Sequence, residues 1–305
     1  MKNINNNIVI TGGNGLLGSK LIDITNGVKF DRSECDLITD NFKFFLDSKN
    51  IKPTTVFHCA AMVGGVIYNN NNNQKFFIDN IKIDDNVLSS CFDLNVKNIV
   101  TILSTCVFPS KVDYPLTSDM IDMGDPHNTN YGYSYAKRIL AYKTKLFKKV
   151  TGNNWISVIP CNLYGVNDNF NIDKSHLIPA LIRKAYEAKI NDTDFVVWGD
   201  GSPLRQFMFS NDIAEIINWS VDNWKEDKPL MAVNEKEFSI KEIANIIADI
   251  IDIPKNKIKY DKTKPNSQFR KPAKSDVNWY DFTPIENGIN DTIEWFIKNY
   301  DNARK

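Results

Sequence analysis

The chain has 305 residues, of which 42% are hydrophobic and 24% are charged, as is ordinary for a globular protein. Its 37 Lys and Arg residues balance 37 Asp and Glu residues, so composition predicts neither a nucleic-acid surface nor an acidic-membrane surface. Five cysteines without a C-x-x-C pair argue against a disulfide framework and against structural zinc. No signal peptide and no run of about eighteen apolar residues is recognisable, so we expect a cytoplasmic protein.

Hydrophobic periodicity predicts alternating strands and helices through the first half of the chain. The expected strands lie in "NIVITGG", "GVKFDRSECDL", "TTVFHCAAMV", "NIVTILST" and "WISVIPCNLYG", the last running into a loop. The expected helices are "LLGSKLIDIT", residues 81–94 and residues 133–150, while the asparagine-rich "YNNNNNQKFF" reads as a solvated loop and helix start. This alternation predicts a Rossmann-like, doubly wound α/β fold with a parallel sheet.

The rhythm weakens in the second half, where a smaller mixed α/β domain is expected. Helices are predicted at "SHLIPALIRKAYEA" and at "SIKEIANIIADII", the second capped by Ser239, with a strand and turn at "FVVWGDG". We expect a dinucleotide-binding domain over residues 1–165, with a returning segment near 206–235. Residues 166–305 would then mainly bind substrate.

A glycine-rich turn follows the first predicted strand. In "VITGGNGLLGSKLI", Gly12, Gly15 and Gly18 are spaced by three, and Gly13, Gly15 and Gly18 satisfy G-x-G-x-x-G. Glycines there permit a tight turn, close approach of the backbone to a pyrophosphate, and close packing of helix on strand. The helix amino terminus adds N–H groups for the phosphates. In this strand–turn–helix context the motif predicts a dinucleotide cofactor.

The end of the second predicted strand bears on which dinucleotide binds. Asp31 would accept a hydrogen bond from a free ribose 2′-hydroxyl, whereas Arg32 could neutralise a 2′-phosphate. An arginine directly past the strand favours NADP, although an ordinary surface arginine is the alternative.

A Y-x-x-x-K pattern lies in "GYSYAKR". The spacing of four puts Tyr133 and Lys137 on one face of a helix, where the ammonium can lower the pKa of the tyrosine and favour proton transfer. Tyr135 competes for this role, but its spacing of two from Lys137 points it elsewhere. With Ser104 at the end of the preceding strand, the pattern predicts a serine, a tyrosine and a lysine around one carbonyl group.

At these motifs the chain resembles the extended short-chain dehydrogenase/reductases and, more closely, the GDP-L-fucose synthase family. The similar segments are "HCAAMVGG", "STCVFP", "PHNTNYGYSYAKR", "CNLYGVNDNFNIDKSHLIPALIRK", "VWGDGSPLRQFMFSNDIAE" and the closing "WF" and "ARK". The resemblance spans nearly the whole chain. It implies an NADPH-dependent enzyme that epimerises a GDP-4-keto-6-deoxy-hexose at C3 and C5 and reduces it at C4 to GDP-L-fucose. It also implies a homodimer joined through helices near Tyr133.

The resemblance implies a role for each matching position. Ser104 and Tyr133 would hold and protonate the C4 oxygen, and Lys137 would hold the nicotinamide ribose. Cys106 and His176 would be the acid/base pair of epimerisation. The residues that would line NADPH are Gly12, Gly13, Asn14, Gly15, Leu16, Leu17, Gly18, Arg32, Asp36, Leu37, Ile102, Leu103, Thr105, Pro160, Asn162 and Leu163. The residues that would contact the nucleotide-sugar are Lys184, Trp198, Arg205 and Lys271.

The implied chemistry gives a physical reason for Cys106. A C4 ketone acidifies the protons at C3 and C5, and enolisation needs a base on one face and an acid on the other. A thiol and an imidazole suit that work. The alternative is that Cys106 is an inert buried cysteine and that His176 is an ordinary loop histidine. His58 and His127 are expected to be structural or supporting residues.

Ordinary roles remain open at the nucleotide-sugar positions. Arg183 and Lys184 would equally suit a solvated helix face, and Trp198 could pack a sugar or fill the core.

The sequence also departs from the family pattern. Asn266 and Ser267 replace an acid and a glycine in "TKPNSQFRK", and Asn234 stands where a glycine is usual. The lost carboxylate removes a hydrogen-bond acceptor, so a related substrate such as a GDP-4-keto-heptose, reduced with or without epimerisation, is an alternative.

Two further classes of function are disfavoured. A 4,6-dehydratase is disfavoured because Thr105-Cys106 lacks the acid that follows the Ser/Thr in those enzymes. A non-catalytic NADP-binding scaffold would be expected to lose Tyr133 or Lys137.

Overall fold

The computed structural model describes residues 5–264 and 268–305, so the departures at Asn266 and Ser267 lie outside the described residues. A six-stranded parallel sheet has the order β2-β1-β3-β4-β5-β9, which confirms the predicted doubly wound α/β fold. Its strands are β1 (Asn5–Thr11), β2 (Gly27–Lys29), β3 (Thr55–His58), β4 (Asn98–Ile102), β5 (Asn154–Pro160) and β9 (Leu230–Ala232). Because β2 and β3 lie on opposite sides of β1, the topological switch point falls between the carboxyl ends of β1 and β3.

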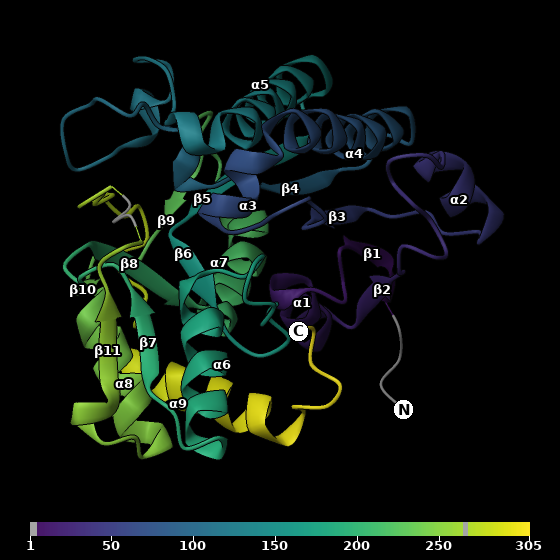
Figure 1. Cartoon of the computed structure of the whole chain (residues 1–305). Coiled ribbons are helices and arrows are strands. Elements are labelled where there is room, and N and C mark those ends of the chain that lie inside the picture. The colour runs from purple at the N-terminus through teal and green to yellow at the C-terminus, as the bar shows by residue number, and fades with distance from the viewer. Residues whose placement is uncertain (1–4, 265–267) are drawn as a thin grey trace.

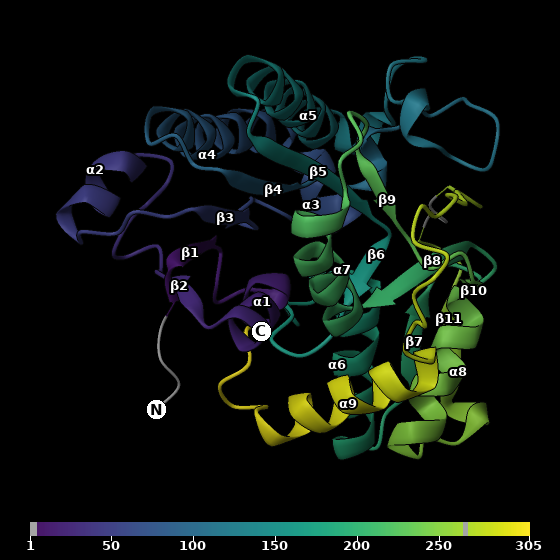
Figure 2. The same ribbon diagram turned by 180° about the vertical axis from the view of Figure 1, so that it is seen from behind.

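Helices cover both faces of this sheet. α4 (Asn73–Asp93) and α5 (Tyr131–Thr151) lie together on one face, with α2 (Phe42–Ser48) beside α4 (Figure 1). α1 (Leu16–Thr25) and α7 (Ser210–Asn223) pack together on the other face, as the reverse view shows (Figure 2). Apolar side chains from the sheet and from all these helices form one hydrophobic cluster.

The chain leaves the first sheet at Cys161. Where the sequence suggested a loop, β6 (Asn162–Tyr164) pairs with β8 (Leu204–Phe209), and β10 (Glu237–Ser239) pairs with the other edge of β8. This difference arises because the partner strand lies about forty residues further along the chain, beyond the reach of local periodicity. A separate parallel pair is formed by β7 (Phe195–Trp198) and β11 (Ile258–Asp261).

Three helices complete this second body: α6 (Leu177–Ile190), α8 (Ile240–Ile251) and α9 (Ile285–Lys298). They surround a second hydrophobic cluster that includes Phe195, Ile247 and Phe296. Ser239 caps α8 as predicted, since its Oγ accepts from Glu242 N at 3.1 Å while the Glu242 carboxylate accepts from Ser239 N at 2.7 Å. Across residues 5–264 and 268–305, no helix has both the length and the apolar character needed to cross a lipid bilayer.

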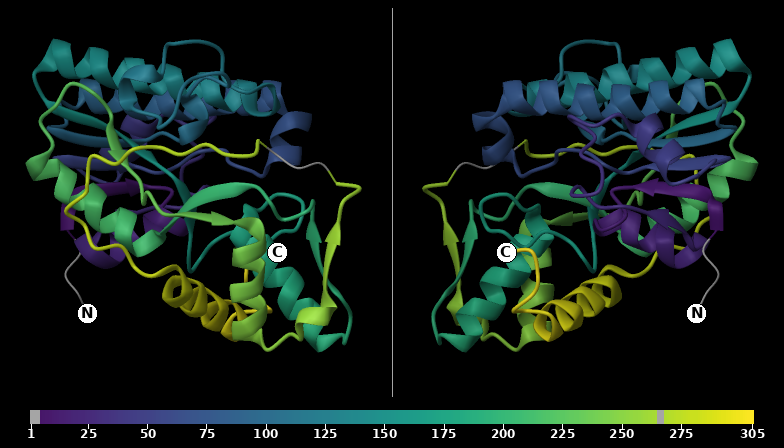
Figure 3. Two further views of the ribbon diagram at one scale, coloured as in Figure 1. Left: turned by 90° about the vertical axis from the view of Figure 1, so that its left-hand side faces the viewer. Right: turned by 90° about the vertical axis from the view of Figure 1, so that its right-hand side faces the viewer.

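The segment that follows residue 267 crosses back to the first body before α9, as the side views show (Figure 3). Ala273 and Val277 are buried in the first hydrophobic cluster, and Ala273 forms an isolated bridge with Leu116. Gln206 on β8 clamps the segment, because its side chain both donates to and accepts from the Ala273 backbone at 2.9 Å. This crossing brings Asp276 to the edge of the parallel sheet, where Asp276 N donates to Met231 O on β9 at 2.9 Å.

The asparagine run is more ordered than its composition predicts. α3 (Val66–Asn71) and the start of α4 make it helical on both sides of Asn72. Buried Asn69 donates to Gly64 O at 2.6 Å, and Asn73 Oδ1 accepts from Gly132 N at 2.9 Å. These tertiary hydrogen bonds, which composition cannot reveal, override the tendency of the run to stay solvated.

Candidate active site

The glycine turn lies between β1 and α1 and has no room for side chains. Gly12 has φ of +68°, and Gly15 N donates to Gly12 O at 2.9 Å. A Cβ on Gly18 would lie 2.2 Å from Gly12 O, and one on Gly12 would lie 2.9 Å from Ala60 N after β3. The turn therefore brings bare backbone to the amino terminus of α1, the arrangement that suits a pyrophosphate.

In the loop after β2, the two residues that favour different cofactors have different hydrogen-bond partners. Asp31 is engaged by its own loop, accepting from Ser33 Oγ at 2.5 Å and from Ser33 N at 2.7 Å, and these bonds hold its pKa below the usual range. Arg32 is exposed and pairs with Asp36 at 2.8 Å. Both Asp31 and Arg32 are therefore exposed and engaged within this loop, whereas Leu37 is buried in the first hydrophobic cluster.

The other residues expected at the cofactor lie along one edge of the sheet. Ile102 ends β4, Pro160 ends β5, and Thr105 begins the short 3₁₀ turn Thr105–Val107. Asn162 follows on β6 and donates to Gln206 O at 2.8 Å. Since the strands are parallel, their carboxyl ends share the edge that also bears the glycine turn.

The 3₁₀ turn after β4 positions the cysteine. Ser104 Oγ accepts from Cys106 N at 3.3 Å and so caps the turn. Arg138 on α5 donates to Val107 O at 2.7 Å, which ties the turn to the tyrosine helix. Cys106 is half-buried there, and its charged form raises the pKa of Tyr133, so thiol and phenol are electrostatic neighbours.

Tyr133 and Lys137 share one face of α5, as their spacing predicts. Lys137 Nζ lies 6.0 Å from the Tyr133 ring centroid, and Lys137 is only 2% exposed. The pKa of Tyr133 is nevertheless raised well above its usual value, first by burial and then by Cys106 and Asp84. Burial and these two negative charges therefore dominate, and the expected lowering of the Tyr133 pKa by the ammonium is not seen. Tyr135 points away and donates to Asp125 at 2.5 Å.

A buried polar chain lies beneath Lys137. Asp84 Oδ1 is 3.6 Å from Lys137 Nζ and 2.9 Å from His58 Nε2, and His58 Nδ1 is 2.8 Å from Thr11 Oγ1. His58 is the structural or supporting residue expected from the sequence, whereas no sequence pattern singled out Asp84. The available signal was a charged residue on the buried stripe of α4, where Ile83, Val87 and other residues face the core.

His176 immediately precedes α6 and makes no capping hydrogen bond with its side chain. His176 is exposed, yet nearby protein atoms lower the pKa of its imidazole by desolvation. No hydrogen bond joins Cys106 to His176 within the described ranges 5–264 and 268–305.

The loop before His176 contacts the start of α3, and a series of aromatic contacts joins α3 to Tyr133. Gly65 N donates to Lys174 O at 3.0 Å, and Lys174 Nζ lies 5.4 Å from the Tyr68 ring. The Phe76 ring contacts both Tyr68, at 5.6 Å between centroids, and Tyr133, at 6.2 Å.

Lys271, one of the expected nucleotide-sugar residues, lies within electrostatic range of Cys106 and of Arg205, another of them. Burial lowers the pKa of Lys271, while the charge of Cys106 opposes this and the charge of Arg205 reinforces it. Arg205 donates to Leu204 O and Gln268 O, both at 2.6 Å, which anchors the crossing segment on β8. Gln206, which clamps the same segment, was missed because nothing in its local sequence marks it.

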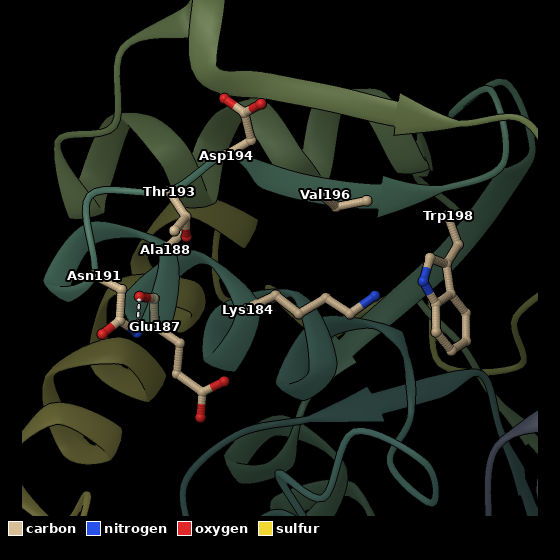
Figure 4. Close-up of a pocket in the computed structure, with 8 residues that line it drawn as sticks. All are labelled: Lys184, Glu187, Ala188, Asn191, Thr193, Asp194, Val196 and Trp198. Atoms are coloured by element: carbon tan, nitrogen blue, oxygen red, sulfur yellow. Dashed lines mark hydrogen bonds between the residues drawn. The ribbon is translucent and has the colours of Figure 1, made fainter.

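The other two residues form a separate group in the second body. Lys184 Nζ lies 4.0 Å from the centroid of the Trp198 indole, a cation–π contact at the edge of a cavity of about 330 Å³ (Figure 4). Trp198 is 38% exposed and therefore does not fill the core. Burial lowers the pKa of Lys184 to about 8. Neighbouring Arg183 instead pairs with Glu187 at 2.7 Å.

Comparisons with known proteins agree with this geometry. The NAD dependent epimerase/dehydratase family matches residues 8–234. The chain is 40% identical to GDP-L-fucose synthase of Dictyostelium discoideum, with 98% of this chain and 97% of that protein covered. A crystal structure of a GDP-L-fucose synthetase from Naegleria fowleri bound to NADP has a TM-score of 0.90 at 36% identity, covering 98% and 94% of the two chains.

A more distant structure matches in fold alone. It is a GDP-6-OMe-4-keto-L-xylo-heptose reductase from C. jejuni, with a TM-score of 0.86 at 23% identity over 97% of this chain and 99% of that one. The family match covers well over half of the sequence, and the Dictyostelium relative aligns along nearly all of it. The chain therefore belongs to the NAD dependent epimerase/dehydratase family, among the relatives of GDP-L-fucose synthases.

Proposed function

We propose that the protein converts a GDP-4-keto-6-deoxy-hexose into GDP-L-fucose by 3,5-epimerisation and NADPH-dependent 4-reduction. The observation that carries this proposal is the placing of Cys106 on a turn that Ser104 caps and Arg138 ties to the Tyr133 helix, within electrostatic range of the Tyr133 phenol. A reductase needs the tyrosine and serine, but only an epimerase needs an additional acid/base group beside them. Relatives named GDP-L-fucose synthase and a related structure bound to NADP support the same conclusion.

The residues present fit a dinucleotide cofactor. In the glycine turn a Cβ at Gly12 or Gly18 would collide with backbone atoms, so the turn presents backbone without side chains at the start of α1. In this proposal the turn holds the pyrophosphate, Arg32 faces the ribose 2′-phosphate, and Lys137 holds the nicotinamide ribose. The strand ends near Ile102 and Pro160 line the rest of the site, and bound NADPH supplies the hydride that C4 receives.

In this proposal the proton transfers are carried out by side chains of the protein. Cys106 and His176 remove and return the protons at C3 and C5, where the C4 ketone makes the carbon acids ionisable. Ser104 then hydrogen-bonds the C4 oxygen while Tyr133 donates a proton to it. The raised pKa of Tyr133 suits this direction, because it keeps the phenol loaded with its proton before the reduction.

The substrate would bridge the two hydrophobic bodies. In this proposal residues 1–165 with the returning segment near 206–235 bind the cofactor, and residues 166–305 mainly bind the nucleotide-sugar. Lys184 and Trp198 would hold the nucleotide end, whereas Arg205 and Lys271 would hold groups nearer the reacting sugar. These four residues supply three cations for a diphosphate and one aromatic face.

A homodimer joined through α5 is part of the proposal. An exposed apolar stripe on α5 supports it, since residues three or four apart share one face of a helix. The stripe consists of Ile139, Tyr142, Leu146 and Val150, each between 42% and 64% exposed. We also place the protein in the cytoplasm, because its five cysteines carry free thiols.

The test is incubation of GDP-4-keto-6-deoxy-D-mannose with the protein and NADPH in heavy water. Oxidation of NADPH with two solvent deuteriums in the product is the expected outcome. Oxidation without deuterium would make the protein a C4 reductase and Cys106 a bystander. Absence of oxidation would overturn the proposal and direct the search to GDP-4-keto-heptoses.

A further inference from the structure

Lys137 shares its buried environment with a carboxylate from another helix. Asp84 on α4 is 4% exposed, and its Oδ1 lies 3.6 Å from Lys137 Nζ on α5. Removing one partner of such a pair would leave a buried charge without compensation. In the proposed function the Lys137 ammonium holds the cofactor ribose. Its position therefore depends on Asp84 of α4 as well as on α5.

His58 completes the arrangement, and its hydrogen bonds are those of a neutral imidazole. Thr11 Oγ1 accepts from Ala60 N at 3.1 Å, so its single proton is available for His58 Nδ1 at 2.8 Å. The proton of His58 then lies on Nε2 and points at Asp84 Oδ1, 2.9 Å away. In this arrangement the carboxylate accepts from a neutral imidazole and balances one ammonium.

The second carboxylate oxygen of Asp84, Oδ2, is buried and has no hydrogen-bond partner among the residues that the structure describes. A buried carboxylate with an unused oxygen is costly to retain for structure alone. Its negative charge also acts on Tyr133, since it is among the causes that raise the pKa of that phenol.

We propose that Asp84 is a positioning residue for the reaction, which fixes the Lys137 ammonium on the Tyr133 side of α5 and keeps Tyr133 in its proton-donating form. The proposal rests on the proposed function for the direction of proton transfer. The groups that face this cluster are His58 from β3, Cys59 after β3, Cys106 from the 3₁₀ turn, and Tyr133 and Lys137 from α5.

The principal test is Asp84→Asn, which keeps the shape of the side chain and removes its charge. Without this charge the phenol ionises more readily, which removes its transferable proton at high pH, and the lysine loses the ion pair that positions it. We expect the alkaline limb of the kcat profile to move to lower pH by about one unit, with kcat roughly tenfold lower at the wild-type optimum.

A second readout needs no substrate, so it separates failure of this inference from failure of the proposed function. Phenolate formation is followed by ultraviolet absorbance, each protein being compared with its Tyr133→Phe counterpart. In Asp84→Asn the Tyr133 phenolate should form at lower pH than in the wild type. An unchanged phenolate titration would overturn the proposal, whatever the substrate proves to be.

Asp79→Asn is the matched control. Asp79 is also buried on α4 and also pairs with a lysine, Lys75 at 2.6 Å, but no contact links it to Lys137. This variant should keep the wild-type pH profile, and an equal shift in both variants would contradict a specific role for Asp84. If Asp84→Asn does not fold, Asp84→Ser replaces it. Failure of both to fold would make the carboxylate structural and overturn the proposal.

Discussion

The ammonium of Lys184 on α6 lies 4.0 Å from the centre of the Trp198 indole ring on β7, whereas Cys106 and Tyr133 lie on the turn after β4 and on α5. A residue there can bind substrate without touching the reacting carbons. We therefore expect Lys184→Met to raise KM for the nucleotide-sugar about tenfold or more while kcat changes little. This is the result expected when the lost interaction is equally strong in the ground state and in the transition state. Steady-state kinetics with NADPH at saturation measure both constants.

Arg183→Gln is the control for this substitution. Arg183 is adjacent on α6 and cationic, but it is engaged by Glu187 at 2.7 Å. Its replacement should leave KM within about twofold of the wild type. An equal rise in KM for both variants would show that general positive charge on α6, and not the Lys184 side chain, attracts the substrate.

Substrate affinity should also depend on pH through Lys184. Burial lowers the pKa of this lysine to about 8, so it is charged below that pH and loses its charge as the pH rises through it. Affinity for the anionic diphosphate should accordingly fall between about pH 7 and pH 9. Lys184→Arg stays charged throughout this range and should lack the fall. Titration calorimetry with GDP at several pH values tests this, and identical profiles for the two proteins would contradict it.

The parts of the site that the sequence predicted are those encoded by short-range spacing. Gly12 to Gly18 lie in one strand–turn–helix unit, and Tyr133 and Lys137 lie one helical turn apart, so local geometry suffices to place them. The Ser239 cap belongs to the same class, since its capping box spans only three residues. Resemblance to a known family added Cys106 and His176, which spacing alone did not connect.

The parts that the sequence missed depend on distant partners. Asp84 acquires its significance from Lys137 and His58, which reach it from α5 and β3. Gln206 matters because the chain returns at Ala273, 67 residues later, to form two hydrogen bonds with it. No local sequence pattern predicts these tertiary contacts, because they are set by the packing of helices and strands and not by periodicity.

Cys106 should be required for proton exchange with solvent. We expect Cys106→Ala to reduce the rate of deuterium incorporation at C3 and C5 at least roughly a hundredfold, the usual range for loss of a positioned acid or base. NADPH binding, measured by fluorescence, should be retained because the glycine turn is untouched. Mass spectrometry of substrate recovered from heavy water gives the exchange rate.

Cys91→Ala is the matched cysteine control. Cys91 is fully buried in α4, and burial raises the pKa of its thiol, so it is a packing residue. Its loss should lower stability by about 1 kcal/mol and leave exchange unchanged. Normal exchange in Cys106→Ala would assign epimerisation to other groups.

Gly18 should tolerate no side chain. A Cβ there would lie 2.2 Å from Gly12 O, so Gly18→Ala must push α1 away from the turn. We expect the free energy of unfolding to fall by about 2 kcal/mol or more and NADPH binding to weaken at least tenfold. Gly152→Ala is the control, because Gly152 ends α5 at φ of +70° with no atom near its missing Cβ. It should cost about 1 kcal/mol through backbone strain alone and leave NADPH binding intact.

Asp168 should make stability depend on pH near neutrality. Burial raises the pKa of this carboxyl from 3.8 to about 7, and its Oδ2 has no hydrogen-bond partner in the described part of the chain. Between these two values the folded state holds the proton and the unfolded state does not. The stability contributed by this proton is complete below about pH 4 and is lost as the pH rises through about 7.

Asp168→Asn should remove this dependence, because an amide stays neutral at every pH. Asn can keep the bond that Asn169 N donates to Asp168 Oδ1 at 2.6 Å. Thermal unfolding should give the variant a Tm about 3 °C or more above the wild type at pH 8, with the difference shrinking towards pH 5. A variant less stable than the wild type at pH 8 would mean that Asp168 is ionised in the folded protein. The nearby Arg304, whose charge lowers the pKa of Asp168, would then outweigh the cost of burial.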